Sequence, residues 1–400
     1  MGIHRGPNTV KDGLVFGYDT GYGIADNETL TRFYPGEPTD NKLSLFTSGN
    51  QSLSYGSNIY IVTAQETNVS DVTAPNGQYS RFTGNSDSDN NQVFWSYAGN
   101  SNNYTGSTVT FSTYLKGSGT CHLTTYDDQS GYGVSSTITL TNEWVRYSYT
   151  RAINASATSH WSGVRGILTS TNVYIAASQT EIKGHATPFT ETTRSSTASL
   201  IDLKKTANID VSNVSFDSTG QPTFDATNDY VNVPNASNLN LTSQGTISVW
   251  INPSTLTQGS YAGLVSKALG GSTNQQSYGL SWRQVSNAFW GEICNGSGTY
   301  NQVTAPFPTV ANVWYNIVFT WNGSQLVIYN NGVSVGTLTQ TINCQALATD
   351  LTIGGYTYKG AGGSNEYFNG KISNVKLYNI GLTATEVQQN YNAYKNRFDI

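Results

Sequence analysis

Apolar and polar residues alternate along short segments in the last fifth of the chain. An α-helix cannot place every second residue on one face, so this pattern restricts the region to half-buried β-strands. In one segment the apolar residues expected near a single face are Trp314, Ile317, Phe319 and Trp321. The pairs Asn322-Gly323 and Asn331-Gly332 predict hairpin turns, because Asn and Gly tolerate the positive φ that tight hairpins need.

One helix is expected near the carboxyl end. Residues 383–386 read Thr-Ala-Thr-Glu, a capping box in which the Thr hydroxyl and the Glu carboxylate satisfy each other's free amides. An apolar stripe then recurs at helical spacing, at Val387, Tyr391, Tyr394 and Phe398. A membrane-surface helix is the alternative, but the polar face carries Gln and Asn instead of a row of lysines. Docking on the sheet is therefore favoured.

Composition limits the classes of function. Only 11% of the 400 residues are charged, 37% are hydrophobic and the net charge is −5 without a basic cluster. This balance is not typical of disorder, and it argues against a nucleic-acid partner. The longest apolar runs are too short to span a bilayer. The first seven residues lack the apolar run of a secretory signal, so folding in a cytoplasm is expected.

The three cysteines, Cys121, Cys294 and Cys344, are odd in number and widely spaced. Buried reduced thiols are the favoured interpretation, and a bridge between Cys294 and Cys344 is the minor alternative.

Two β-rich regions follow each other along the chain. The strands expected after residue 243 lie at 245–253, 263–267, 278–282, 289–293, 326–329 and 351–355. Those expected earlier lie at 107–116, 121–126, 136–140, 144–149 and 172–177. Short strands with Gly, Asn and Pro between them predict an all-β chain, with two antiparallel β-sandwich or jelly-roll domains and one short C-terminal helix.

The carboxyl-terminal region resembles the concanavalin A-like/laminin G-like sandwich modules common in tailed-phage virion proteins. Residues 12–19, Asp-Gly-Leu-Val-Phe-Gly-Tyr-Asp, look like the opening strand of those modules. The next two segments of the modules have counterparts at 200–203 and 224–233, more than 180 residues later. The resemblance implies a module that binds or builds and seldom catalyses.

The intervening region resembles the carbohydrate-binding-module-like jelly rolls embedded in many phage tail and fibre proteins. Its closing segment, residues 179–189, reads Gln-Thr-Glu-Ile-Lys-Gly-His-Ala-Thr-Pro-Phe. We therefore expect residues 1–40 to form an amino-terminal arm and the first strand of the laminin G-like sandwich, 41–192 an inserted jelly roll, and 193–400 the rest of the sandwich. The rival arrangement is three beads on a string. It leaves the first strand with an exposed edge, which favours insertion.

No paired carboxylates of the kind that glycoside hydrolysis needs are visible on one strand. Glu292 stands alone and Asp127-Asp128 looks like a turn. Sugar binding is favoured instead, because lectin sites combine aromatic rings with Asn, Asp and Gln. The candidate residues are Tyr126, Asp128, Tyr132 and Trp161 in the jelly roll, with Trp95 beside them, and Trp282, Trp290 and Tyr300 in the sandwich. The alternative is that most of these rings fill cores.

Calcium is the cofactor most consistent with the resemblance, although none is expected to be required. Candidate oxygen ligands are Asp87 and Asp89 in a loop at 85–90, and Asp225 and Asp229 in a second loop. The first loop lacks a closing bidentate Glu, so a solvated loop is favoured there. The second pair is better explained as part of a turn.

The resemblance implies a non-enzymatic structural protein of a tailed-phage virion, either a capsid decoration protein or a head or tail fibre or adhesion subunit. Its partners would be other virion proteins and host-surface glycans, and it would be present in multiple copies. The alternatives are a glycan-degrading enzyme on the same fold and a bacterial surface lectin.

Overall fold

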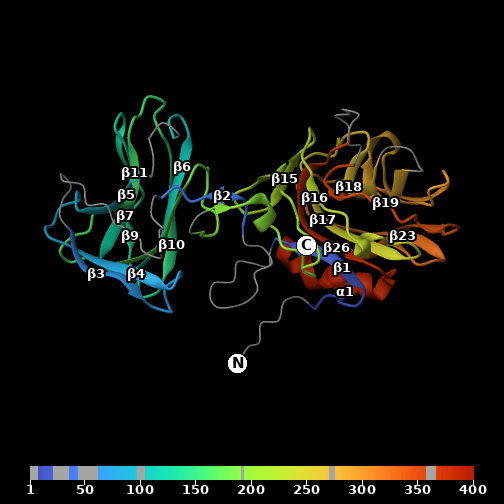
Figure 1. The fold of residues 1–400 in the computed structure, drawn as a ribbon, viewed down its shortest axis with the longest axis horizontal. Coiled ribbons are helices and arrows are strands. Elements are labelled where there is room, and N and C mark those ends of the chain that lie inside the picture. The colour runs from blue at the N-terminus through green and yellow to red at the C-terminus, as the bar shows by residue number, and fades with distance from the viewer. Residues whose placement is uncertain are drawn as a thin grey trace. The chain divides into compact units, whose positions relative to one another are not determined.

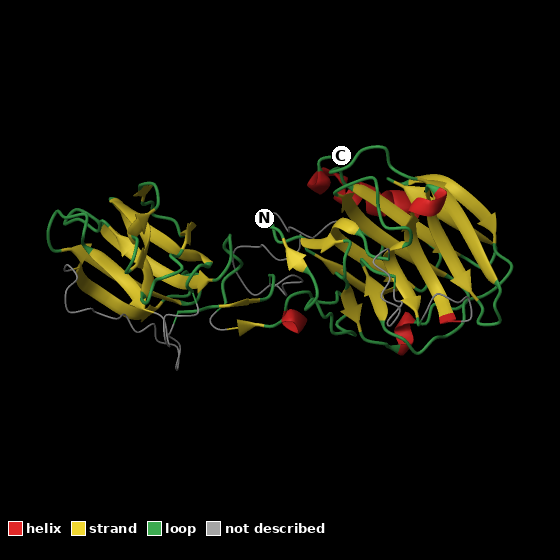
Figure 2. Cartoon of the chain, turned by 90° about the horizontal axis from the view of Figure 1, so that it is seen from above, coloured by secondary structure: helices red, strands yellow, loops and turns green. Residues whose placement is uncertain are grey.

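The structure, a computed structural model, describes residues 8–20, 36–43, 62–96, 104–190, 193–269, 275–356 and 366–400. Its strands pair antiparallel, and one short α-helix lies near the carboxyl end (Figure 2). The expected all-β class is confirmed. The chain clusters into two compact units: unit 1 comprises Met1–Pro38 with Ser195–Ile400, and unit 2 comprises Thr39–Arg194.

Unit 1 contains an eight-stranded sheet (Figure 1). Seven of its strands are, in spatial order, β14 (Ser215–Phe216), β15 (Pro222–Asp225), β26 (Asn369–Tyr378), β17 (Gly245–Pro253), β22 (Tyr315–Trp321), β23 (Gln325–Asn330) and β24 (Val333–Thr339). The eighth, β1 (Leu14–Asp19), pairs with the second half of β26, and β15 pairs with the first half. β26 is therefore hydrogen-bonded along both of its edges.

A six-stranded sheet forms the second layer of unit 1. Its strands are β16 (Val231–Val233), β25 (Leu351–Ile353), β18 (Ala262–Ala268), β19 (Gln276–Arg283), β20 (Ala288–Cys294) and β21 (Tyr300–Pro306). The main core lies between the two sheets and contains residues from both, for example Phe16, Ile247 and Phe319 with Leu264 and Leu280. Unit 1 is thus a β-sandwich.

The hairpin predicted at Asn331-Gly332 joins β23 to β24. Asn331 has φ 50° and Gly332 has φ 81°, the positive values that a two-residue hairpin turn requires. The prediction for Trp314 was wrong, because its ring does not join Phe319 and Trp321 in the main core. It packs instead against Phe398, with ring centroids 4.7 Å apart.

Helix α1 (Ala384–Tyr394) covers the outer face of the eight-stranded sheet, and a 3₁₀ turn (Lys395–Phe398) extends it. Trp250 of β17 is stacked against Tyr391, with centroids 5.9 Å apart, and against Phe398, with centroids 4.3 Å apart. Other 3₁₀ turns are Ser196–Ala198, Ser237–Leu239 and Gln284–Ser286. The predicted docking of the apolar stripe is confirmed, and this sheet is covered on both faces.

Unit 2 is a second sandwich. One sheet contains β10 (Val145–Ala152), β6 (Thr108–Ser118), β12 (Asn172–Glu181), β4 (Gln78–Gly84) and β3 (Val62–Ser70). The other contains β5 (Gln92–Ser96), β11 (His160–Arg165), β7 (Thr120–Asp127), β8 (Gly131–Val134) and β9 (Ile138–Thr139). Their shared core includes Phe82, Phe111 and Val173 from the first sheet and Leu123 and Val164 from the second. A short pair, β2 (Thr39–Asp40) with β13 (Thr193–Arg194), joins the two ends of the unit.

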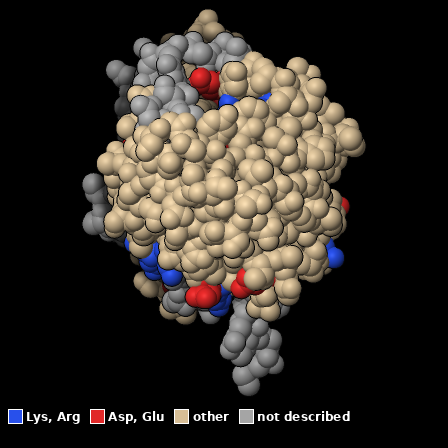
Figure 3. All heavy atoms as spheres, turned by 90° about the vertical axis from the view of Figure 1, so that its right-hand side faces the viewer, with Lys and Arg blue, Asp and Glu red and all other residues tan. Residues whose placement is uncertain are grey.

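The three cysteines are free and buried, as the favoured interpretation expected. Burial raises the pKa of the Cys121 and Cys294 thiols to about 12 and raises that of Cys344 further still. Among the described residues no helix is long and apolar enough to cross a membrane. Figure 3 shows the right-hand side of Figure 1, where charged atoms are few and lie mostly at the margin.

The cap of α1 gives a test of this packing. The Thr383 hydroxyl accepts a hydrogen bond from the backbone amide of Glu386, and the Glu386 carboxylate accepts one from the amide of Thr383. We expect Thr383→Ala to lower the free energy of unfolding of unit 1 by about 1 kcal/mol. Thr385→Ala is the matched control, because Thr385 is exposed within the first turn. The Thr385→Ala substitution should leave the free energy of unfolding unchanged or raise it slightly. Urea unfolding with hydrogen exchange of the α1 amides checks this, and equal losses in the two variants would contradict the assigned cap.

Candidate functional site

Three of the predicted sugar-binding residues come together in unit 2. Tyr126 of β7 lies opposite Trp161 of β11 on one side and opposite Tyr132 of β8 on the other. Leu123 and Val164 of the same strands point into the core. Because side chains alternate along a strand, Tyr126 and Trp161 lie on the face that points away from it. We call Tyr126, Tyr132 and Trp161 the aromatic cluster.

The rings of the aromatic cluster contact one another in two geometries. Tyr126 and Trp161 are stacked, with centroids 4.7 Å apart and planes 14° from parallel. Tyr132 meets Trp161 edge-on, with centroids 5.2 Å apart, and it is 42% exposed. The cluster thus offers aromatic surface outside the core of the domain, held by contacts between its own rings.

Two polar residues that the sequence analysis did not identify fix Tyr132 in place. The guanidinium of Arg165 lies 4.0 Å from the centre of the Tyr132 ring, in cation–π contact. The side-chain amide of Gln92 donates a hydrogen bond of 3.0 Å to the Tyr132 hydroxyl. Arg165 lies on β11, four residues along the strand from Trp161, and Gln92 lies opposite it on the neighbouring strand β5. Only the strand order places them there, so no local sequence motif could have indicated them.

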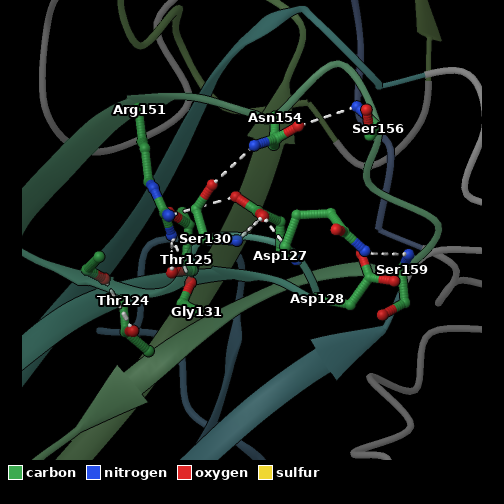
Figure 4. Close-up of polar contacts among 12 residues, drawn as sticks. Thr124, Thr125, Asp127, Asp128, Ser130, Gly131, Arg151, Asn154, Ser156 and Ser159 are labelled. Carbon is green, nitrogen blue, oxygen red and sulfur yellow. Dashed lines mark hydrogen bonds and ion pairs between the residues drawn. The ribbon is translucent and has the colours of Figure 1, made fainter.

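A buried ion pair supports the loop that leads to Tyr132 (Figure 4). The Asp127 carboxylate, which is fully buried, lies 3.2 Å from the Arg151 guanidinium of β10. Its other oxygen accepts hydrogen bonds from the amides of Gln129 and Ser130, which close the turn between β7 and β8. Arg151 also donates to the carbonyl of Gly131 at 2.7 Å. The turn is therefore fixed on its core side.

Asp128, a predicted sugar-binding residue, is used within its own loop (Figure 4). Its Oδ1 accepts hydrogen bonds from the amides of Thr158 and Ser159, and its Oδ2 accepts one from the Thr158 hydroxyl. The Thr158 hydroxyl and amide lower the pKa of Asp128 to about 2, so the side chain is ionised at neutral pH. Asp128 thus joins two loops beside the aromatic cluster.

The first predicted calcium loop lies next to the same sheet. Asp87 accepts hydrogen bonds from the amide and hydroxyl of Thr169, and these lower the pKa of its carboxyl. The backbone carbonyl of Asp89 accepts a hydrogen bond from Arg165, and so does the Asn90 side chain. In this geometry the loop holds Arg165, which in turn lies on the Tyr132 ring.

The second predicted calcium pair forms a turn in unit 1. Asp225 Oδ1 accepts a hydrogen bond from the amide of Thr227, and Asp229 Oδ2 accepts one from the amide of Asp225. Partial burial, with the Asp225 charge nearby, raises the pKa of Asp229. In the described part of the chain no three His, Cys, Asp or Glu side chains gather as a metal site would need.

The predicted sandwich residues do not form one site. The prediction for Trp282 has to be corrected: its side chain is 0% exposed and is stacked on Phe307 in the core, with centroids 4.3 Å apart. Trp290 lies opposite Thr304 and Tyr300 lies opposite Cys294 on the same ladder. Four residues along a strand separate them by about 13 Å. Tyr300 is 50% exposed, and the side chain of Trp95 lies outside the described ones.

Glu292 takes part in a buried cluster that the sequence analysis missed. The Arg283 guanidinium lies 3.2 Å from its Oε1, and the Tyr356 hydroxyl donates to the same oxygen at 2.7 Å. Arg283 also donates to the Ser281 hydroxyl at 2.8 Å. Three rings each lie 4.8 Å from the guanidinium carbon, namely Tyr261, Trp290 and Tyr356. Arg283 and Glu292 are each only 6% exposed, so the ion pair is shielded from water.

Comparison with known families agrees with the fold of unit 1. Residues 225–388 match the family described as the concanavalin A-like lectin/glucanases superfamily. The matched residues all lie within unit 1. The match covers less than half of the chain and leaves unit 2 outside it. No curated protein sequence matches the chain.

Solved structures with a similar arrangement include two toxin binding domains. The binding domain of Paraclostridial Mosquitocidal Protein 1 is 17% identical with a TM-score of 0.40, and 49% of each chain is covered. The botulinum neurotoxin serotype G binding domain is 16% identical with a TM-score of 0.39, and 48% of each chain is covered. A Trypanosoma rangeli sialidase is 18% identical with a TM-score of 0.37, covering 48% of this chain and 30% of its own. The chain spans about half or less of the length of these structures.

His160 of β11 is a buried histidine whose side chain lies on the core side of the sheet, opposite the aromatic cluster. His160 pairs with Asp127 across β11 and β7, next to the Trp161–Tyr126 pair, and its ring lies 5.7 Å from that of Tyr104. Burial lowers the pKa of His160 from 6.5 to about 4. The charge of Asp127 acts to raise this pKa, and the charge of Arg151 acts to lower it. The unfolded chain therefore binds one more proton between pH 6.5 and 4. The contribution of neutral His160 to the stability of unit 2 is therefore fully present above pH 6.5 and is lost as the pH falls toward 4.

We expect this histidine to contribute about 2–3 kcal/mol to the fall in stability across that window. Urea unfolding at a series of pH values, compared between the protein and His160→Gln, isolates the contribution from that of the carboxylates. The variant should show a flatter dependence, and the control His185→Gln should keep the original one. An unchanged slope in His160→Gln would be inconsistent with a neutral buried His160.

Proposed function

We propose that the protein is a non-enzymatic carbohydrate-binding protein and that the aromatic cluster of unit 2 is its contact surface. The observation that carries this proposal is the meeting of Tyr126, Tyr132 and Trp161 outside the core. Sugar rings have an apolar face that packs on aromatic rings, while their hydroxyls need hydrogen-bonding partners. Arg165 and Asp128 lie at the edges of the cluster and offer such partners.

The geometry in unit 1 supports binding over catalysis. Glycoside hydrolysis needs two carboxyl groups, one of which gives or takes a proton. One oxygen of Glu292 already receives both the Arg283 guanidinium and the Tyr356 hydroxyl. Both contacts hold the Glu292 side chain in place within the buried cluster. We assign the Arg283–Glu292 pair to the structure of the sheet.

For the biological setting we propose a tailed-phage virion, as a capsid decoration protein or a head or tail fibre or adhesion subunit, in contact with other virion proteins and host-surface glycans. The support is the resemblance of the strand motifs in both units, together with the low charge of the face in Figure 3. Few charges mean little repulsion between identical copies, as a protein present in many copies requires. A glycan-degrading enzyme and a bacterial surface lectin are the alternatives.

We propose that no cofactor is required for binding. Asp87, Asp225 and Asp229 already accept hydrogen bonds from nearby backbone amides. A structural Ca²⁺ at these loops would have to share those oxygens.

The binding proposal predicts the effect of removing rings from the cluster. On a glycan array and in calorimetry with the best glycan found, Trp161→Ala and Tyr132→Ala should each weaken binding at least about fivefold, since a stacked ring contributes about 1 kcal/mol or more. Val134→Ala is the matched control, because Val134 lies two residues along β8 from Tyr132 and is 47% exposed. It should bind like the original protein. EDTA should leave the affinity unchanged.

Several outcomes would count against the proposal. If no glycan binds and the protein instead associates stably with phage capsids or tails, the sandwiches serve as building blocks alone. Release of reducing ends from the bound glycan would favour the enzyme alternative. Loss of binding in EDTA would assign Ca²⁺ a direct role.

A further inference from the structure

The other sheet of unit 2 carries a pocket of about 290 Å³ on its outer face. Tyr79 of β4, Lys116 of β6 and Tyr174 of β12 line it, together with Trp144 just before β10. Phe82, Leu115 and Val173 on the same strands point into the core, so the side chains of Tyr79, Lys116 and Tyr174 point away from it. The volume is at the low end of the range of about 300–1,000 Å³ for ligand pockets, which suits one small ligand unit.

The walls of the pocket are aromatic and their positions are fixed. The Tyr79 ring lies 5.3 Å from that of Tyr174 and 6.4 Å from that of Trp144. The Tyr79 hydroxyl donates to Glu66 at 2.9 Å, and Arg81 pairs with the same carboxylate at 3.2 Å. Three rings from three segments therefore form a preorganised surface, which lowers the entropy cost of binding.

Two opposite charges also line the pocket. The Lys116 ammonium lies 5.8 Å from the Trp144 ring and 5.9 Å from the Tyr174 ring, and within the described chain it has no hydrogen bond or ion pair. Asp71 is the acid. The Thr73 amide and hydroxyl bind its Oδ1 and lower its pKa, with a smaller contribution from Lys116, so Oδ2 is an ionised acceptor.

Further polar atoms of the lining residues lack partners. The Trp144 indole nitrogen and the Asn172 Oδ1 are buried and have no hydrogen bond among the residues that the structure describes. Buried polar atoms are nearly always paired, so unpaired ones in a pocket wall indicate a missing partner such as water or a ligand hydroxyl. The pocket therefore combines aromatic surface with unused donors and acceptors.

We propose that this pocket is a second carbohydrate site that binds one neutral pyranose unit. Asp71 would repel a carboxylated ligand, and Lys116 would repel a cationic one. A neutral ring with neighbouring hydroxyls can accept a hydrogen bond from Lys116 and donate another to Asp71. Its apolar face would pack on the aromatic walls. The inference rests on the proposed function for its ligand class. It concerns a separate site, because the aromatic cluster lies on the outer face of the opposite sheet of the same sandwich.

The eight tryptophans of the chain allow the two sites to be tested apart. The full protein, labelled with ¹⁵N in its indoles, is titrated with neutral methyl hexopyranosides, with glucuronate and with glucosamine. Trp144→Phe and Trp161→Phe assign the two informative resonances. A neutral hexopyranoside should shift the Trp144 resonance. Lys116→Met, which keeps the side-chain stem and removes the donor, should raise the Kd for that shift at least about tenfold.

Charge variants make the test of ligand class sharper. Asp71→Asn should weaken neutral binding and allow glucuronate to bind, because Lys116 then lacks an opposing charge. Asp89→Asn is the matched control: Asp89 is an exposed Asp of the same unit that does not line the pocket, and its substitution should leave the Kd unchanged.

The remaining outcomes decide between the two sites, test the ligand class or count against both sites. A shift of the Trp161 resonance alone, or insensitivity of the Trp144 shift to Lys116→Met, would overturn the pocket and leave the aromatic cluster standing. Binding of glucuronate or glucosamine alone to the unaltered protein would overturn the neutral ligand class. A Trp144 shift without any Trp161 shift would keep the pocket and count against the cluster. No shift at either resonance would count against both sites.

Discussion

Strand β26 is the constraint on which unit 1 depends. It is hydrogen-bonded to β17 along one edge and to β15 and β1 along the other, so four strands share one set of backbone groups. Its apolar residues alternate between two environments: Val375 and Leu377 face the main core, and Tyr378 faces the layer under α1. A shift of register by one residue would exchange both layers.

Strand pairing also joins the two ends of unit 2, through the short strands β2 and β13. Thr193 pairs with Asp40 and Arg194 pairs with Thr39, so the two ends of a unit of more than 150 residues are hydrogen-bonded to each other. Adjacent ends let a domain fold around its own core at small cost in closure entropy. The core of unit 2 then uses only the inward positions of its strands. The outward positions of both sheets are left to carry the aromatic cluster and the pocket.

The sequence was sufficient for local features and insufficient for those that depend on register. The strand at Gly245–Pro253 and the capped helix were predictable because alternation and capping are local signals. Trp282 was misplaced because an aromatic residue in an alternating strand has two possible faces, and only the partner strands select one. The stack of Tyr126 on Trp161 could not be predicted, since the two residues are neighbours only through the pairing of β7 with β11.

The pocket residues show the same limit more strongly. Tyr79, Lys116 and Tyr174 come from three strands that are separated in sequence and adjacent in the sheet order β6-β12-β4. Each looks like an ordinary outward position by itself, and only their convergence makes a site. Such small sites bind single sugar units weakly, because one ring and a few hydrogen bonds contribute little against the entropy of association. Display in many copies, which we propose for the biological setting, would raise the affinity because several copies could engage the glycan at once. On that proposal the low charge of the chain would let copies pack densely, and each copy would add its own weak contact to the glycan surface.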